Sequence, residues 1–252
     1  MSFKRTYMVP HKLNNDTVYL HVLAGFGNRL RALVSGICLA EDLNKKLVII
    51  WKPNYSCKIS LPECFDMKTL PYTYNQTMPT ENFMNVTNES DIPSSLLTIE
   101  SYSAFYKAYT PKWYEVLRRI KFNKTINIEP LLEILNDNFI GIHIRRTDNS
   151  KSILGSPNNY FLETMKKEVE TNPQAQFYLA TDCQETKEII LKNFKDRIIT
   201  HKFVLNRHTK EGMVNSLTDF LSLSLCSKIL GSVHSSYSEM AAAYGNKVLV
   251  LP

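Results

Sequence analysis

One stretch decides the fold: Phe139-Ile140-Gly141-Ile142-His143-Ile144-Arg145-Arg146-Thr147-Asp148. Its isoleucines alternate with Gly141, His143 and Arg145, which is the two-residue period of a β-strand. A strand that is dense in branched aliphatic residues and ends in charged ones is typical of the centre of an open α/β sheet. Because ligands bind such sheets outside the carboxyl ends of their strands, we expect the loop after this strand to border a binding site.

Arg145 and Arg146 suit a diphosphate, because planar guanidinium groups can hold phosphate oxygens with two parallel hydrogen bonds. The alternative is a pair of arginines on a solvated face that forms only surface salt bridges, and such pairs are common. The strand pattern alone does not choose between the two.

The composition is that of an ordinary globular protein whose net charge suits an anionic ligand. The chain has 252 residues, of which 44% are hydrophobic and 21% charged, enough to bury a core in one large or two small domains. Its net charge of +6 is spread along the chain and suits a ligand such as a nucleotide. Aromatic residues do not interleave with a basic stripe, so nucleic acid is not an expected partner.

The cysteines and the apolar segments favour a cytoplasmic location. Five cysteines without CxxC spacing predict a reduced, intracellular protein, although Cys57 and Cys64 could pair in a loop. No signal peptide heads the sequence, and no apolar run reaches the roughly 18 residues of a membrane span. The sequence has six Asn-x-Ser/Thr sites, which we interpret as a result of its composition rather than as glycan acceptors. A secretory-pathway location stays open if the chain is trimmed from a longer protein.

The first 51 residues predict a βαβ unit. We expect a strand at 18–23, a Gly-rich turn at 24–28, a helix with an apolar stripe at 29–44 and a parallel strand at 46–51. The turn stands at the helix N-terminus, where anions bind readily. A plain turn that needs the conformational freedom of glycine explains the same residues equally well.

Residues 52–111 have a weaker pattern, interpreted either as a substrate-facing region or as loop filler. Short strands are expected near 96–99 and 105–106, and helices at 113–120 and 126–135. We place a domain boundary near Lys124, which divides the chain into domains at 1–124 and 125–252.

The second half alternates strands with helices. Strands are expected at 139–144, 176–180, 197–200, 228–231 and 247–251, and helices at 159–170, 211–226 and 237–244, with a loop at 149–158. Asp182 and Glu185 have the spacing of a capping box that opens a further helix to 194. The alternation predicts an α/β fold with mainly parallel sheets and right-handed crossovers.

Three loops that follow strands of the second half carry candidate ligand-binding residues: Arg145, Arg146 and Asp148, then Thr181 and Asp182, then His234, Ser235, Ser236 and Ser238. In a parallel sheet these loops lie on the same edge. The serines begin a helix, whose free N–H groups and dipole attract negative charge. A guanidinium opposite them would complete a diphosphate site without a metal. N-capping alone also explains the serines, and Asp182 alone is better explained as a cap than as a catalyst.

Several kinds of site lack their sequence signature. No D-x-D sequence occurs, and no His, Cys, Asp or Glu residues have metal-ligand spacing, so we predict no metal site and no cofactor. G-x-S-x-G and G-x-x-x-x-G-K-[ST] are also absent, which argues against a hydrolase elbow and a P-loop kinase.

The chain resembles the α1,2-, α1,6- and protein O-fucosyltransferase superfamily in three motifs. The segment 143–148 resembles its H-x-R-R-x-D motif, and Phe26-Gly27-Asn28-Arg29 resembles its G-x-G-N turn. The segment 219–226, followed by Gly231 and 235–238, is similar to its third motif in residue type and spacing. The likeness covers the first 50 residues and nearly all of 139–245, and three motifs in the same order are far more specific than one.

The resemblance implies a GT-B architecture: two facing Rossmann-like domains, the first on the acceptor side and the second binding the nucleotide sugar. It also implies metal-free transfer with inversion from a GDP-fucose donor to a glycan or protein acceptor. By this likeness Arg145 holds the β-phosphate and stabilises the departing GDP, and Ser235 and Ser236 bind the same diphosphate. The other expected donor-binding residues are Asn28, His143, Arg146, Asp182, Asp219 and Ser238, with His143 and Asp219 at the guanosine end.

The sequence departs from the family in three places. Asn149 follows Asp148 where the α1,6 enzymes have a lysine, and Ser152-Ile153 stand where those enzymes have a glutamate that resembles a general base. Gly25 stands where the protein O-fucosyl enzymes have an arginine. We therefore assign Asp148 as a provisional base. A transferase of another nucleotide sugar and a noncatalytic nucleotide- or glycan-binding module remain alternatives, and the sequence does not predict the oligomeric state.

Overall fold

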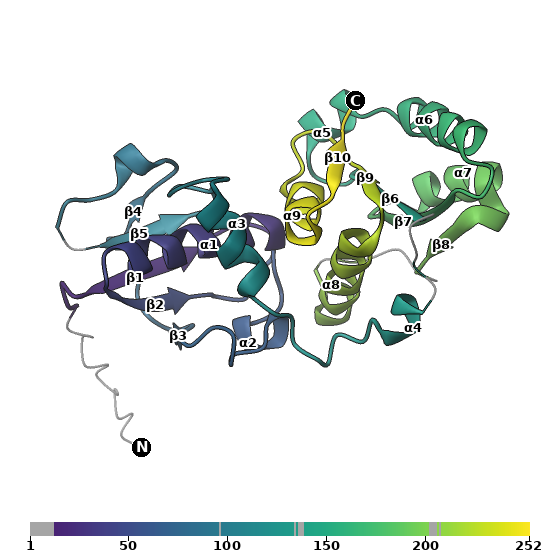
Figure 1. The fold of residues 1–252 in the computed structure, drawn as a ribbon. Helices are drawn as coiled ribbons and strands as arrows, with labels where there is room; N and C mark the ends of the chain where they lie inside the picture. The colour runs from purple at the N-terminus through teal and green to yellow at the C-terminus, as the bar shows by residue number, and fades with distance from the viewer. Residues whose placement is uncertain (1–12, 96, 134, 136–138, 202–205, 207) are drawn as a thin grey trace, which may run out of the picture.

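Two five-stranded parallel sheets form the framework of the computed structural model (Figure 1). The structure describes all residues except 1–12, 96, 134, 136–138, 202–205 and 207. The strand order is β3-β2-β1-β5-β4 in the first sheet and β10-β9-β6-β7-β8 in the second, and every pairing between these strands is parallel.

The first sheet and its helices come from the first half of the chain: β1 (Thr17–Val22), α1 (Phe26–Asp42), β2 (Lys46–Ile50), α2 (Leu61–Cys64), β3 (Thr73–Asn75), β4 (Met84–Asn85), a 3-10 turn (Glu89–Asp91), β5 (Thr98–Ser101) and α3 (Pro111–Arg119). The βαβ unit of β1, α1 and β2 is confirmed. Most residues of α1 between Phe26 and Ala40 are buried, because the helix is covered by the first sheet and by α9.

The second sheet comes from the rest of the chain: α4 (Glu129–Leu132), β6 (Phe139–Ile144), α5 (Ser150–Gly155), α6 (Asn158–Thr171), β7 (Gln176–Thr181), α7 (Gln184–Phe194), a 3-10 turn (Lys195–Arg197), β8 (Ile198–Thr200), α8 (Lys210–Leu225), β9 (Lys228–Leu230), α9 (Ser236–Gly245) and β10 (Val248–Val250). As its sequence predicts, β6 is the central strand. All six of its residues are buried, and it pairs with β7 and β9.

The structure differs from the sequence prediction in three segments. Residues 149–158 were expected to form a loop, but they contain α5, which Asn149 caps by accepting a hydrogen bond from the Ser152 N–H (3.1 Å). Residues 105–106 form no strand, and Phe105 is buried in the core. The helix expected at 126–135 is the single turn α4, and part of that range lies outside the described residues.

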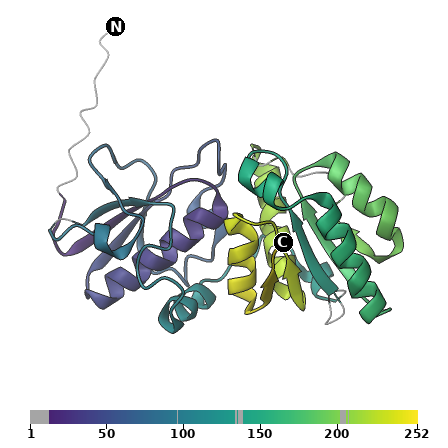
Figure 2. The same cartoon turned by 90° about the horizontal axis from the view of Figure 1, so that it is seen from above.

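One apolar core continues from the first half of the molecule into the second. Helix α9 packs on α1 and α3, and Figures 1 and 2 both show it beside α1. At this junction Phe26 of α1 contacts Phe220 of α8 edge to face, with ring centroids 5.3 Å apart, and Phe122 contacts Tyr244 of α9 at 5.3 Å. The two halves are therefore joined by packed side chains as well as by the chain. The domain boundary near Lys124 falls between the two sheets and stays a prediction.

No helix in the described part of the chain has the length and apolar character needed to cross a membrane.

Candidate functional site

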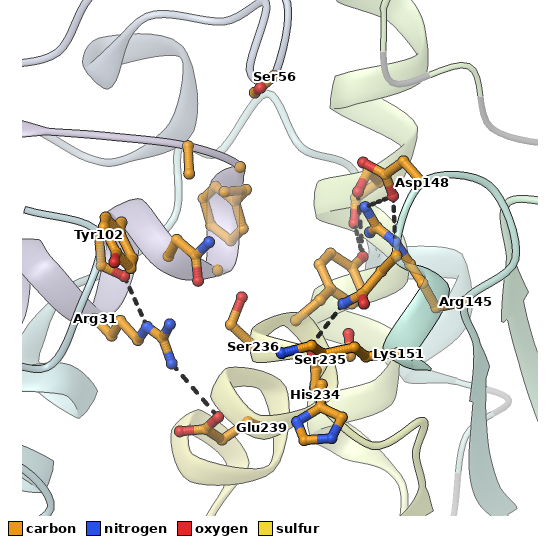
Figure 3. Close-up of a pocket in the computed structure, with 18 of the residues that line it drawn as sticks. Arg31, Ser56, Tyr102, Arg145, Asp148, Lys151, His234, Ser235, Ser236 and Glu239 are labelled. Carbon is orange, nitrogen blue, oxygen red and sulfur yellow. Dashed lines mark hydrogen bonds and ion pairs between the residues drawn. The ribbon is translucent and has the colours of Figure 1, made fainter. Parts of the chain in front are cut away.

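A cleft of about 820 Å³ opens between the two halves of the molecule. Its walls include the loops that follow β1, β2, β5, β6 and β9, the first turns of α1 and α9, and part of α8. Asn28, Arg145, Asp148, Ser235 and Ser236, all predicted from sequence to bind or act on the ligand, line this one cleft. Figure 3 shows Arg145 and Asp148 on one side of it and Arg31, Tyr102 and Glu239 on the other.

The N-terminal ends of α1 and α9 meet at the cleft. A Cβ atom on Gly27 would lie 2.7 Å from the carbonyl oxygen of Ser236, so only glycine allows the two helices to approach this closely. The N-caps of the helices are Gly25, which has no side chain, and Ser235, whose side chain makes no capping hydrogen bond. Because the first N–H groups of a helix have no partner within the helix, two helix ends present donors and positive dipole ends to the cleft.

The backbone of Arg145 is fixed and its side chain reaches the cleft. The Ser232 hydroxyl accepts a hydrogen bond from the Arg145 N–H (3.1 Å) and donates one to the His143 carbonyl (3.2 Å), which ties β6 to the loop after β9. The guanidinium donates to Asp148 through Nε (2.9 Å) and through Nη2. Its Nε also lies 3.6 Å from the Asp182 carboxylate. The Arg145 charge is thus held in place by two carboxylates.

Arg146 was predicted to bind the ligand beside Arg145, but its side chain does not reach the cleft. Its guanidinium donates to the Asn158 side chain (3.0 Å from Nε), to the Ser156 carbonyl (2.7 Å) and to the Arg145 carbonyl (2.8 Å). It also lies over the ring of Phe161, 6.0 Å from the centroid. These contacts explain why the two guanidinium groups do not face the same ligand position. Arg146 instead ties the loop after β6 to α6.

A smaller cavity of about 60 Å³ adjoins the cleft at Arg145, and three predicted site residues, His143, Asp182 and Asp219, line it. His143 packs against the ring of Tyr237, with centroids 4.9 Å apart. Burial, and then the nearby Arg145 charge, lower the pKa of His143 to about 3, so the imidazole is neutral at physiological pH. Its Nδ1 is buried without a hydrogen-bond partner among the described residues.

Asp219 is buried at the base of this cavity. Its carboxylate accepts a hydrogen bond from the Tyr178 hydroxyl (2.6 Å), and the Nε2 atom of His201 lies 3.0 Å from the same oxygen. Burial raises the pKa of Asp219, whereas the contact with Asp219 raises the pKa of His201. Each shift favours the protonated form of its group.

Asp182 does not cap the following helix, so the predicted capping box is wrong. Helix α7 begins at Gln184 after Cys183. The Asp182 carboxylate instead accepts hydrogen bonds from the Arg146 N–H (2.7 Å) and the Thr147 hydroxyl (2.6 Å). It therefore shapes the loop after β6.

Ser238 is fully buried and lies outside both cavities. A Cβ atom on Gly231 would lie 2.8 Å from its hydroxyl oxygen, so Ser238 packs against the loop after β9. The structure brings Ser235 and Ser236 to the cleft but not Ser238.

Arg31, Tyr109 and Glu239 lie together at the end of the cleft away from Arg145, and the sequence did not predict this group. Arg31 donates a hydrogen bond to the Tyr102 carbonyl (2.9 Å) and lies 3.8 Å from the Glu239 carboxylate. Tyr109 donates a hydrogen bond to that carboxylate. Burial, and then this hydrogen bond, raise the pKa of Tyr109 to about 12. Helical spacing could have found two of these residues, because Arg31 follows Asn28, and Glu239 follows Ser236, by three positions.

The cleft is suited to a ligand with a concentrated negative charge. Its positive groups are two helix N-termini, Arg145, Arg31 and the exposed Lys151. Its negative groups are the carboxylates of Asp148 and Glu239. Among the described residues, no three His, Cys, Asp or Glu side chains are grouped as metal ligands would be.

Neither the protein-family models nor the curated proteins include a match to this sequence. Solved structures do match. The NodZ α1,6-fucosyltransferase crystallised with GDP is 15% identical with a TM-score of 0.63, over 89% of this chain and 91% of that one. The NodZ fucosyltransferase from Bradyrhizobium is 14% identical with a TM-score of 0.63, over 89% and 92%.

A second group of similar structures is that of POFUT1. Its apo form is 11% identical with a TM-score of 0.63, over 95% of this chain and 99% of that one. At identities this low the likeness establishes the fold alone. The predicted fold class, α/β with two GT-B-like Rossmann-type sheets, is therefore confirmed, and the predicted resemblance is confirmed at the level of the fold.

Proposed function

We propose that this protein is an inverting, metal-independent glycosyltransferase that transfers fucose from GDP-fucose to a glycan or protein acceptor. The observation that carries the proposal is the convergence of Arg145 with the N-terminal ends of α9 and α1 in one cleft. These groups come from three separate parts of the chain, and each of them attracts an anion.

Charge develops on the diphosphate when the bond between the sugar and GDP breaks. Donors that already point to that charge lower the barrier, because they need not reorganise during the reaction. In this proposal Arg145 and the N–H groups of Ser235 and Ser236 supply the stabilisation, and Asn28 contacts the donor from the other half. No step in it requires a metal ion, so transfer should persist in excess chelator.

The choice of donor rests on the solved structures of the same fold. NodZ has been crystallised with GDP, and POFUT1 has been crystallised with GDP and with GDP-fucose. Here the small cavity beside Arg145 would receive the polar edge of the guanine base. His143 and Asp219 line that cavity, and together they offer a neutral imidazole and a carboxyl group for hydrogen bonding.

Calorimetric titration with GDP, GDP-fucose, UDP-sugars and ADP-sugars in EDTA tests the donor. We expect GDP and GDP-fucose to bind, and Arg145→Met to weaken GDP binding by about 10- to 150-fold, the effect of losing a charged hydrogen bond of roughly 1.5–3 kcal/mol. Its rate of transfer should fall by about 10²–10³-fold. Arg118, exposed on α3, provides the control: Arg118→Met should bind GDP as the wild type does. Tight binding of another nucleotide instead of GDP would contradict the donor assignment.

A noncatalytic nucleotide- or glycan-binding module is the second candidate. It is favoured by one observation: Asp148, the provisional base, is bound to Arg145 and so lies with the leaving group. Single-turnover release of GDP from GDP-fucose, with a panel of glycan and peptide acceptors, separates the two. A transferase releases GDP faster when its acceptor is present, whereas a binding module releases none.

A further inference from the structure

Glu239 is the carboxylate at the far end of the cleft. It lies on α9, three residues after Ser236, and therefore about one helical turn from the helix end that faces the proposed diphosphate position. Arg31, whose Nη1 lies 3.8 Å from this carboxylate, occupies the same place on α1, three residues after Asn28. Figure 3 shows Ser236 between this pair and Arg145. The proposed leaving-group position and the Glu239 carboxylate thus belong to different ends of one cleft.

Two carboxylates line the cleft among the described residues, Asp148 and Glu239. Displacement with inversion needs a base on the face of the sugar opposite the leaving group. Asp148 is hydrogen-bonded to Arg145, which in the proposed function binds that leaving group. Its position therefore disfavours Asp148 as the base and leaves Glu239.

The contacts of Glu239 hold one of its oxygens and leave the other accessible to a substrate. Tyr109 donates a hydrogen bond to Oε1, which fixes the orientation of the carboxylate. Oε2 lies 3.8 Å from Arg31 Nη1, longer than a hydrogen bond. The Arg31 guanidinium is itself positioned by the Tyr102 carbonyl (2.9 Å). A hydroxyl group that enters this end of the cleft can therefore donate to Oε2.

We propose that Glu239 is the general base of the transfer and that the acceptor hydroxyl binds between it and the donor sugar. This inference rests on the proposed function. The acceptor oxygen forms a bond to the anomeric carbon while the bond from that carbon to the β-phosphate oxygen breaks. The electron pair of the broken bond leaves with GDP. The hydroxyl proton passes to Oε2 of Glu239 and then to water, so charge and atoms balance.

The rival role for Glu239 is structural. Its contact with Arg31 joins α9 to α1. If this ion pair is only structural, replacing either residue should reduce the activity equally. Arg31→Met breaks the pair but keeps the carboxylate, whereas Glu239→Gln keeps the shape but removes the base. Glu63→Gln is the matched control, because Glu63 makes another ion pair between the two halves, with Lys210, and lies outside the cleft.

The test uses the whole protein with GDP-fucose as donor and water or sodium azide as the attacking group. We expect Glu239→Gln to bind GDP within about twofold of the wild type but to release GDP from GDP-fucose in water about 10²–10⁴-fold more slowly, the usual contribution of a general base. Azide carries no proton to remove. It should therefore restore GDP release by Glu239→Ala and give fucosyl azide of inverted configuration. Arg31→Met should lose less than about tenfold, and Glu63→Gln less than about twofold.

Two results would overturn the inference and spare the proposed function: hydrolysis by Glu239→Gln within about threefold of the wild-type rate, or equal losses in Glu239→Gln and Arg31→Met without azide rescue. If the wild type binds no GDP and releases none from GDP-fucose, the proposed function itself fails and this inference fails with it. The GDP titration therefore shows which of the two is at fault.

Discussion

Gly27 is the residue that decides how closely the two halves approach. Its missing side chain lets the α1 backbone contact the Ser236 carbonyl, and the same contact brings both helix ends to the cleft. A side chain at position 27 must push against backbone atoms, which cannot rotate away. Gly25, only two residues earlier, is different: a Cβ there would lie 3.8 Å from the nearest backbone oxygen, which is ordinary contact, and its φ is −77°.

We therefore predict that Gly27→Ser lowers the free energy of unfolding by about 1–3 kcal/mol, the usual cost of overpacking, and weakens GDP binding at least about tenfold. The matched variant Gly25→Ser should keep the wild-type free energy of unfolding or raise it, because serine is a favoured N-cap. Urea denaturation and calorimetry measure both effects. Equal stability of the two variants would mean that the approach of α1 to α9 is not tight.

At the scale of elements, the sequence predicted those with a clear hydrophobic period. Strand β6 and the unit of β1, α1 and β2 have such periods, so their boundaries fall within about three residues of the expected ones. Helix α5 was missed because Ser150–Gly155 is short and has no apolar stripe. The strand β4 has only two residues and is defined by its partner β5, which a local pattern cannot reveal.

The candidate site likewise has a part that the sequence predicts and a part that it does not. The meeting of Arg145 with Ser235 and Ser236 was predictable, because parallel strands place their following loops on one edge of the sheet. The direction of Arg146 was not predictable, because it depends on Asn158 and Ser156 in another segment. The contact of Arg31 with Glu239 joins helices from the two ends of the chain, and no spacing rule in the sequence connects them.

At the scale of the whole molecule, the continuous core predicts that the two halves unfold together. Phe220 belongs to α8 in the second half but is buried against Phe26 in the first. Both tryptophans, Trp51 and Trp113, are buried in the first half. Tryptophan fluorescence therefore reports on the half that does not contain Phe220.

We predict that Phe220→Ala lowers the free energy of unfolding by about 3–5 kcal/mol, as is usual for a large buried aromatic residue. The urea midpoint should shift equally by tryptophan fluorescence and by far-UV circular dichroism. Phe177→Ala, in the separate core around β6 and β7, provides a comparison that leaves the junction intact. A fluorescence midpoint that Phe220→Ala leaves unchanged would show that the first half is stable on its own.

The central claim is that the helix ends and Arg145 together hold a diphosphate, and a crystal structure with GDP tests it most directly. The account predicts that the β-phosphate lies between the Arg145 guanidinium and the N–H groups of Ser235 and Ser236, with the guanine edge toward His143 and Asp219. Phosphate density elsewhere on the molecule, or in the cleft but without contact to either Arg145 or the start of α9, would contradict it.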